Sequence, residues 1–316
     1  MEPEMMPILE EKLKEFPDRD KYLKKEHDMK LLTLIDKKVN NNIELTPDEL
    51  KFLYKKGDKI TGFGYWEDPR IEEIKRKRNE RRDYGLIFNV KEEEVALSQE
   101  EWLNNPEKFK ALTRNIDLGS LTSANGLVLP QHVGGHIYLG HLTNADGLVL
   151  PQHVGGHIYL NRLTNADGLV LPQYIGGDIN LRSLESAKGL IFPQHVGGLI
   201  YLSSLTSAEG LVLPQHVGGG IDLSSLTSAE GLVLPQHAGG VIDLRSLTSA
   251  EGLVLPQHVG DFILLSSLTS AEGLVLPHYF DLNKLKCPNN IKEEIMNNPN
   301  KYYMAPTEED NKGIKR

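Results

Sequence analysis

The residues of this chain that could perform acid–base or metal chemistry recur at a fixed interval. Histidine follows Pro-Gln at six equivalent positions spaced by 21 residues or a multiple of 21, namely His132, His153, His195, His216, His237 and His258. Three more histidines, His136, His141 and His157, crowd the first repeats. A zinc site needs convergent, well-oriented ligands, whereas a column of neutral rings at a corner needs none. We therefore expect no metal, with a pH-sensitive surface as an alternative.

A second column is acidic. Equivalent positions hold Asp146, Asp167, Glu209, Glu230, Glu251 and Glu272. Like charges one repeat apart repel, so they must be solvated or met by a cation or a basic partner. Calcium solenoids use aspartate-rich glycine turns with a different spacing, so we expect a solvated edge and no cofactor. Catalysis requires one unique constellation, whereas these groups recur in every copy, and we expect no enzyme activity.

The element that carries these columns is a 21-residue repeat. Its first residue recurs at Leu121, Leu142, Leu163, Leu184, Leu205, Leu226, Leu247 and Leu268. Within one unit, apolar residues alternate over 211–213 and 221–223, which predicts two short strands. Pro214 and the Gly218-Gly219 pair mark the corners between these strands.

A single unit cannot bury its own apolar residues, so the units must stack. Each strand would pair in parallel with its copy one repeat on, at about 4.8 Å per coil. Identical side chains then lie above one another, and ladders of Leu, Ala, Val and Ile fill the interior. The sequence therefore predicts an α+β chain. It has a small α-helical domain over 1–110, a leucine-rich-repeat-like parallel β-solenoid of about eight 21-residue coils over 111–280, and a cap with a polar tail over 281–316.

The phrases Leu213-Pro214 and Val217-Gly218-Gly219, followed by Ile221-x-Leu223, resemble a group of bacterial tandem-repeat proteins. These proteins alternate a Leu-Pro corner with a Val-Gly-Gly-x-Leu-x-Leu strand and are loosely described as leucine-rich. The resemblance covers about half of the chain. It implies a repeat architecture that tends to bind macromolecules, with no defined ligand. The Leu121 series stands where standard leucine-rich repeats carry an inward asparagine ladder, so we expect a flatter β-solenoid rather than a horseshoe with outer helices.

The copies differ mainly in and around the Ile-x-Leu strand, while the Leu-Val-Leu-Pro-Gln-His-Val part hardly changes. Alternation points three variable rows to solvent on one sheet face. The partner-binding face that we expect there comprises Tyr138, Tyr159, Asn180, Arg182, Tyr201, Asp222, Asp243, Arg245, His136 and His157. Aromatic and Arg anchors dominate protein interfaces, which favours a protein partner. Neutral drift between recent duplicates is the alternative.

The opposite sheet is expected to carry an exposed row of β-branched residues, of which Val212 is typical. The row comprises Val128, Val149, Val170, Ile191, Val212, Val233, Val254 and Val275. Either the N-terminal region or the C-terminal tail covers this row, or it is a surface for self-association. Simple β-propensity is a third interpretation.

Residues 1 to about 110 contain no repeat and are rich in charge. Helices are predicted over 8–16 and 20–38, and Thr46 caps a further helix. A helix over 71–82 carries a basic cluster of Lys75, Arg76, Lys77, Arg78, Arg81 and Arg82. With Tyr65 and Trp66 stacking on bases, this cluster could bind RNA, which makes nucleic acid the alternative partner. The competing interpretation is a solvated helix face balanced by neighbouring glutamates.

Composition limits the remaining classes of function. The net charge of −9 disfavours general affinity for nucleic acid. Cys287 is the only cysteine, so no intramolecular disulfide can form. The N-terminus lacks the basic and apolar regions of a secretion signal, and no run approaches the roughly 20 apolar residues of a membrane span. We expect no membrane association and a cytoplasmic location.

Overall fold

The structure is a computed structural model that describes residues 19–54 and 68–305. The chain divides into two compact units, Met1–Glu92 and Glu93–Arg316. The helix expected over 8–16, together with Tyr65 and Trp66, lies outside the described residues. Each unit is considered by itself below.

The described part of the first unit is helical. Its helices are α2 (Arg19–Asn40), α3 (Pro47–Leu53), α4 (Arg70–Arg76) and α5 (Glu80–Phe88). The predicted cap of α3 is confirmed: Thr46 Oγ1 accepts from the Glu49 amide at 3.3 Å, and Glu49 Oε2 accepts from the Thr46 amide at 2.8 Å. Apolar side chains from all four helices, such as Leu32, Leu50 and Ile71, form one buried cluster.

The prediction of a single helix over 71–82 is wrong. Helix α4 ends at Arg76, and Asn79 begins α5 as its N-cap, with Asn79 Oδ1 accepting from the Arg82 amide at 3.1 Å. Asparagine is a strong N-cap because its side chain satisfies an amide that has no partner within the helix. The basic cluster is therefore divided between two helices and the turn that joins them.

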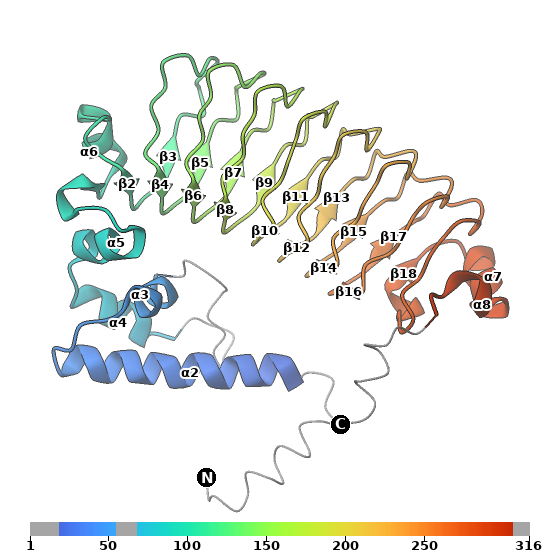
Figure 1. The fold of residues 1–316 in the computed structure, drawn as a ribbon, viewed down its shortest axis with the longest axis horizontal. Coiled ribbons are helices and arrows are strands. Elements are labelled where there is room, and N and C mark those ends of the chain that lie inside the picture. The colour runs from blue at the N-terminus through green and yellow to red at the C-terminus, as the bar shows by residue number, and fades with distance from the viewer. Residues whose placement is uncertain (1–18, 55–67, 306–316) are drawn as a thin grey trace, which may run out of the picture. The chain divides into compact units, whose positions relative to one another are not determined.

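The second unit is a parallel β-solenoid, in which each coil contributes one strand to each of two sheets (Figure 1). The described strands of sheet A are β1 (Val95–Ala96), β2 (Ala111–Leu112), β4 (His132–Val133), β6 (His153–Val154), β8 (Tyr174–Ile175), β10 (His195–Val196), β12 (His216–Val217), β14 (His237–Ala238) and β16 (His258–Val259). Those of sheet B are β3 (Ile116–Asp117), β5 (Ile137–Tyr138), β7 (Ile158–Tyr159), β9 (Ile179–Asn180), β11 (Ile200–Tyr201), β13 (Ile221–Asp222), β15 (Ile242–Asp243), β17 (Ile263–Leu264) and β18 (Leu285–Lys286).

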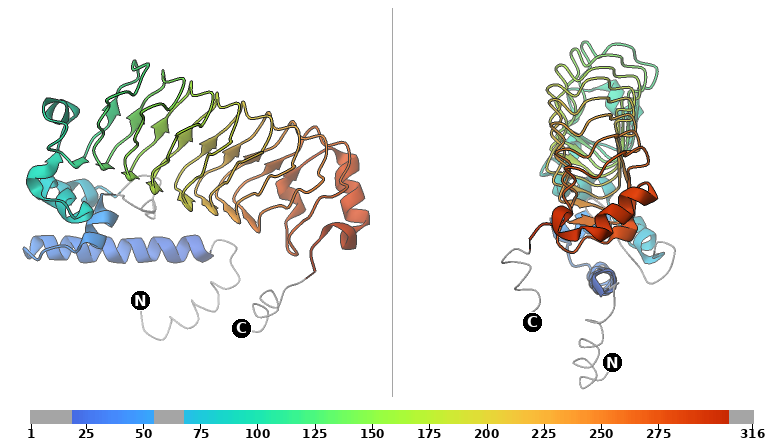
Figure 2. Two further views of the ribbon diagram at one scale, coloured as in Figure 1. Left: turned by 45° about the horizontal axis from the view of Figure 1, so that its top comes forward. Right: turned by 90° about the vertical axis from the view of Figure 1, so that its right-hand side faces the viewer.

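Every repeat pairs with the next in register, as the sequence predicts. His216 pairs with His237 in sheet A, and Ile200 pairs with Ile221 in sheet B, each 21 residues on. The view along the array shows the coils superposed one behind another (Figure 2). Leu, Ala, Val and Ile residues of each coil lie buried in one continuous cluster that extends from Ala96 to Tyr302. The expected interior ladders are therefore confirmed.

The strand predicted over 211–213 lies a few residues further along the repeat. Leu211 is buried and Val212 is exposed, as alternation requires, but over 211–213 the coils are joined only by isolated bridges, such as Ile191 with Val212. The regular ladder forms at His216–Val217 instead. Pro214 accounts for the difference, because it has no amide hydrogen and interrupts the ladder between the two segments. The histidine column accordingly lies in sheet A and not at a corner.

Glycine makes the corner between the two sheets possible. A Cβ on Gly218 would lie 2.3 Å from the Gly197 carbonyl oxygen of the preceding coil, which leaves no room for any side chain. A second glycine in each coil serves a turn: the Glu209 amide donates to Ser207 Oγ at 3.2 Å, and Gly210 follows with φ of +76°. That left-handed conformation favours glycine.

Side chains that do not belong to the repeat close the two ends. At edge strand β3, Gln99 of α6 (Gln99–Asn104) donates from Nε2 to the Asp117 carbonyl at 3.0 Å and accepts from the Asp117 amide at 2.5 Å. Its amide group thus extends the ladder of sheet B by one step. At β16, the Lys284 ammonium donates to the carbonyl oxygens of Val259 and Gly260. Covered edges prevent open-ended pairing with other chains.

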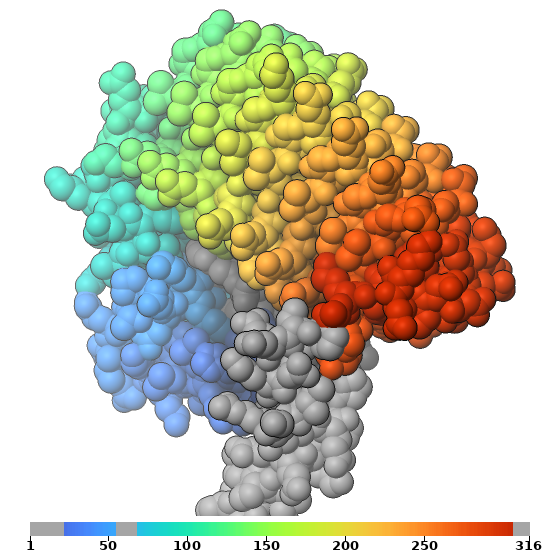
Figure 3. Space-filling model, turned by 45° about the vertical axis from the view of Figure 1, so that its right-hand side comes forward, coloured from blue at the N-terminus to red at the C-terminus, as the bar shows by residue number. Residues whose placement is uncertain are grey.

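Helices complete the C-terminal closure. Helix α7 (Asn289–Asn297) and the short helix α8 (Pro299–Tyr302) follow β18, and Figure 3 shows this segment in red against the orange coils. Ile291, Ile295 and Tyr302 are buried against the solenoid core. These helices lie within the cap that the sequence predicts after the repeats. Just before them, Phe280 is buried and Tyr279 is exposed.

Candidate interaction face

The outer face of sheet B carries most of the residues expected to contact a partner. In each of its repeat strands the isoleucine points inward and the next residue points outward. The outward residues in successive coils are Asp117, Tyr138, Tyr159, Asn180, Tyr201, Asp222, Asp243 and Leu264. Parallel pairing in register places them in a single row across the sheet.

Aromatic rings stack at the N-terminal end of this face. The Tyr138 and Tyr159 rings lie 4.8 Å apart at 4°, and the His136 and His157 rings beside them lie 4.5 Å apart at 11°. All four side chains are partly exposed. Burial, with smaller contributions from Tyr138 and nearby groups, raises the pKa of Tyr159, so its hydroxyl remains a hydrogen-bond donor at neutral pH. The structure thus brings these four expected residues together as two stacks of rings, with each imidazole inclined to the neighbouring tyrosine ring, at 68° for His136 and 58° for His157.

The two histidines of this surface also hold the coils together. His136 Nδ1 accepts from the His157 amide at 2.8 Å, and His157 Nδ1 accepts from the Asp178 amide at 2.7 Å. The same ladder continues on both sides: Asn115 Oδ1 accepts from the His136 amide, and Asp178 Oδ1 accepts from the Leu199 amide, each at 2.8 Å. Each ring therefore carries its proton on Nε2. This role was not predicted from the sequence, although the run of Asn, His, His and Asp at one repeat position is a signal for it.

Two residues of the row from Asp117 to Leu264 are buried although they lie on the outer side of the sheet, so the expectation that the whole row faces solvent is wrong. Asn180 and Asp243 are only 3% and 8% exposed. Asn180 Oδ1 accepts from the amide and Nε of Arg182, each at 3.2 Å, and Asp243 Oδ1 accepts from the amide of Arg245 at 3.1 Å and its Nε at 3.0 Å. Short polar side chains bond readily to a backbone amide two residues on, which turns them back against the chain.

The charged residues of the C-terminal half present a different surface. Asp222 Oδ1 accepts from the Ser224 amide at 3.1 Å, while the Arg245 side chain stays 58% exposed over Asp243. The hydrogen bond that Arg245 donates to Asp243 raises the pKa of Arg245, so the guanidinium remains charged. Asp243 lies four repeats beyond Tyr159, so the aromatic and charged halves are separate regions of one face.

The outer face of sheet A carries the histidine column. The rings of His216, His237 and His258 stack at 4.7 and 4.8 Å. Burial and the two neighbouring imidazoles lower the pKa of His237, and burial lowers that of His132. Within residues 19–54 and 68–305, no group of three or more His, Cys, Asp or Glu side chains is placed to hold a metal ion.

The basic cluster of the first unit is engaged in contacts within that unit. Arg78 donates to the buried Asp83 carboxylate from Nε at 2.7 Å and from Nη2 at 2.6 Å, and Asp83 also accepts from Tyr54 Oη at 3.0 Å. Other contacts of the cluster are Arg82 with Glu44, Lys75 with Glu72 and Lys77 with Asn40. Arg76 ends α4 and Arg81 lies in α5. These pairings favour the structural interpretation of the cluster over a nucleic-acid site.

No protein-family model matches the chain, and neither the curated proteins nor the solved structures contain a match. In the described part of the chain, none of the helices has the length and apolar character needed to cross a membrane. What the molecule does must therefore be inferred from its own surfaces.

Proposed function

We propose that the solenoid is a non-catalytic binding module that recognises a protein partner through the outer face of sheet B. The observation that supports this most is the stacked, partly exposed pair Tyr138 and Tyr159, flanked by His136 and His157. Tyrosine combines a large apolar ring with a polar hydroxyl and is enriched among residues that dominate binding energy.

The rigidity of this face favours binding. The Tyr138 and Tyr159 backbones pair directly in sheet B, and the ladder through the two histidines joins the same coils a second time. Side chains that are already ordered lose little conformational entropy when a partner docks. The row of Tyr, Asn, Tyr and Asp continues across β7 to β13, so a partner could extend from the aromatic half toward Asp222 and Arg245.

The test is affinity capture from a lysate of the source cell, with the full chain immobilised. The double variant Tyr138→Ser/Tyr159→Ser should retain the specific partner at least about 10-fold less, because each tyrosine anchor contributes 1 kcal/mol or more. Tyr174→Ser is the matched control, since Tyr174 stacks on His153 at 4.3 Å in sheet A. Thermal melting of all three proteins would separate lost binding from lost structure.

Two outcomes of this capture would contradict the proposal. One is retention that is unchanged in the sheet B variant or reduced equally in the sheet A control. The other is retained material that nuclease removes, with binding that depends steeply on salt and is weakened by Lys75→Ala/Lys77→Ala. That second outcome would identify nucleic acid as the partner and the basic cluster as its site.

A further inference from the structure

The Leu-Val-Leu side of the coils carries a continuous row of exposed β-branched side chains. This valine column comprises Val128, Val149, Val170, Ile191, Val212, Val233, Val254 and Val275. The first seven expose between 45% and 74% of their surface. At Val275 the C-terminal segment covers the row: the Leu276 amide donates to the Tyr302 carbonyl and the Met304 amide donates to the Leu276 carbonyl, each at 2.8 Å. Among the described residues, the backbone of this segment pairs only with the last coil.

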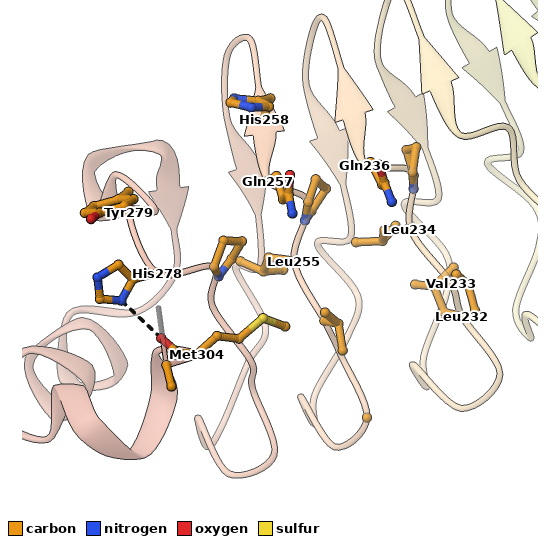
Figure 4. A pocket seen from close by; sticks show the side chains of 16 residues that line it. Leu232, Val233, Leu234, Gln236, Leu255, Gln257, His258, His278, Tyr279 and Met304 are labelled. Atoms are coloured by element: carbon orange, nitrogen blue, oxygen red, sulfur yellow. Dashed lines mark hydrogen bonds between the residues drawn. The ribbon is translucent and has the colours of Figure 1, made fainter. Parts of the chain in front are cut away.

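The surface beside the C-terminal end of the column is hollowed. A groove of about 510 Å³ lies over the last coils, lined by Val233, Val254, Leu234, Leu255 and Met304 among others. Figure 4 shows the Met304 side chain extending toward Leu255 from the C-terminal segment. The exposed apolar surface is thus broader than a line of single side chains.

Strand formation accounts for only half of the column, since bridges join Ile191 with Val212 and Val254 with Val275. Within the described residues, Val128, Val149, Val170 and Val233 take part in no β-bridge. β-branched residues stabilise strands because they pack against cross-strand neighbours, and no ladder of that kind runs through these four positions. Contiguous apolar surface on a soluble protein commonly marks a contact site.

Two polar columns flank the valines. On one side lies the acidic column of Asp146, Asp167, Glu209, Glu230, Glu251 and Glu272, interrupted by Lys188. On the other lies the glutamine column of Gln131, Gln152, Gln173, Gln194, Gln215, Gln236 and Gln257. All of these side chains are exposed. The face therefore has an acidic edge, an apolar centre and a carboxamide edge.

We propose that a second copy of this chain covers the valine column, in a dimer whose two-fold axis runs parallel to the direction in which the coils stack. Such a rotation exchanges the two edges of the face and keeps each coil at its own height. Each valine then meets the same valine of its partner, and each acidic column lies opposite the partner's glutamine column. Carboxylates accept hydrogen bonds from carboxamide NH₂ groups, so both edges are complementary.

The charges disfavour the other face-to-face arrangement, in which only Lys188 would meet an opposite charge, on Glu209 of the partner subunit. A two-fold axis perpendicular to the stacking direction would keep each edge on its own side and reverse the order of the coils. Asp146 would then lie opposite Glu251 of the partner subunit, and Asp167 would lie opposite Glu230 of the partner subunit. Like charges at that separation repel, so the parallel arrangement is preferred.

The area of this face suffices for a stable dimer. From Val128 to Val275 there are seven coil steps, which at about 4.8 Å each give a length of roughly 34 Å. From the acidic column to the glutamine column there are six residues, of which the first two form the turn at Glu209-Gly210, so the width is roughly 17 Å. The face therefore measures about 580 Å² per copy, and a dimer would bury about 1,150 Å² in total, which exceeds the roughly 1,000 Å² expected of a specific interface.

The first test is sedimentation velocity of the full chain at about 50 µM, a concentration well above the dissociation constants of most interfaces of this size. We expect twice the chain mass of 35.4 kDa. Val170→Glu/Val212→Glu should weaken the dimer at least about 100-fold, because each new carboxylate would face its own copy in an apolar centre. Ser204→Glu/Ser266→Glu adds the same charge at exposed positions beyond sheet B and should leave the dimer intact.

The second test fixes the orientation by cross-linking with a short bis-maleimide in a Cys287→Ser background. Val149→Cys alone and Val254→Cys alone should each form cross-linked dimers, because the parallel arrangement places each cysteine opposite its own copy, at the spacing of about 10 Å usual for packed sheets. Cross-linking only when the two variants are mixed would overturn the parallel arrangement. A wild-type monomer at 50 µM would overturn the dimer itself, as would an undiminished dimer in the Glu variant. Protection of the Val212→Cys thiol in a monomer would show that another segment of the chain covers the column.

Discussion

Substituting Gly239 by alanine should loosen the solenoid locally, because its Cβ would lie 2.1 Å from the Gly218 carbonyl oxygen. Contacts of a Cβ shorter than 3.0 Å are essentially never found, so the two coils must separate by about 0.9 Å. Two hydrogen bonds cross the same gap, from the Gly239 amide to Val217 at 2.8 Å and from the Gly240 amide to Gly219 at 2.9 Å. Their loss at about 1 kcal/mol each, with about 1–3 kcal/mol of overpacking, predicts a local destabilisation of about 3–5 kcal/mol.

Gly252→Ala is the matched control in the next turn of the chain. Gly252 has φ of +78°, and nothing lies within 4 Å of a Cβ placed on it. Its substitution should therefore lower the local stability only by the energy needed to hold alanine in the left-handed conformation, about 1–2 kcal/mol. Hydrogen exchange measured by mass spectrometry suits a repeat array, whose stability is a sum of local terms. Peptides over 216–262 should exchange at least about 10-fold faster in Gly239→Ala than in Gly252→Ala. Equal or reversed rates would refute the close-approach argument.

Three further outcomes follow from the contacts. The lowered pKa values of His132 and His237 mean that the unfolded chain takes up protons first, so the free energy of unfolding should fall as the pH drops below about 6.5. Melting curves at pH 7.5 and 5.5 check this, and replacing both rings by Phe should flatten the dependence. Arg78→Met leaves the buried Asp83 carboxylate without its cation and should destabilise the first unit by about 3–5 kcal/mol in urea denaturation, whereas a loss under 1 kcal/mol would contradict the ion-pair account. Gln99→Leu removes two hydrogen bonds from the edge of sheet B, so exchange over 116–118 should accelerate while central coils stay protected; uniform acceleration would show that Gln99 acts on the whole array.

Much of the architecture can be predicted from the sequence because each coil repeats the same spacing of apolar, proline and glycine residues. The step of 21 residues and the inward Ile221 and Leu223 positions predict parallel pairing in register, and the structure has Ile200 against Ile221. The capping box at Thr46 is equally local, since all of its partners lie within three residues. The exposed face of sheet B was also foreseeable, because alternation in a strand fixes which side chains point away from the core.

Which side chains on that face remain available was decided by neighbours in space. His136 and His157 bond to amides one coil on, Asn180 and Asp243 lie beneath arginines, and none of these contacts follows from residue type alone. The position of the first strand depended likewise on inter-coil pairing: alternation over 211–213 set burial correctly, but Pro214 shifted the ladder to His216.

The sequence by itself thus determined the 21-residue period, the buried positions of each coil and the capping box at Thr46, because these depend on spacing along the chain. Tertiary structure alone decided how the array ends. Gln99 meets Asp117 and Lys284 meets Val259 across 18 and 25 residues, and neither residue belongs to the repeat. In the folded stack, the outermost strands have backbone amides and carbonyls with no neighbouring strand to bond to. Which distant side chains form hydrogen bonds with these groups depends on the tertiary structure.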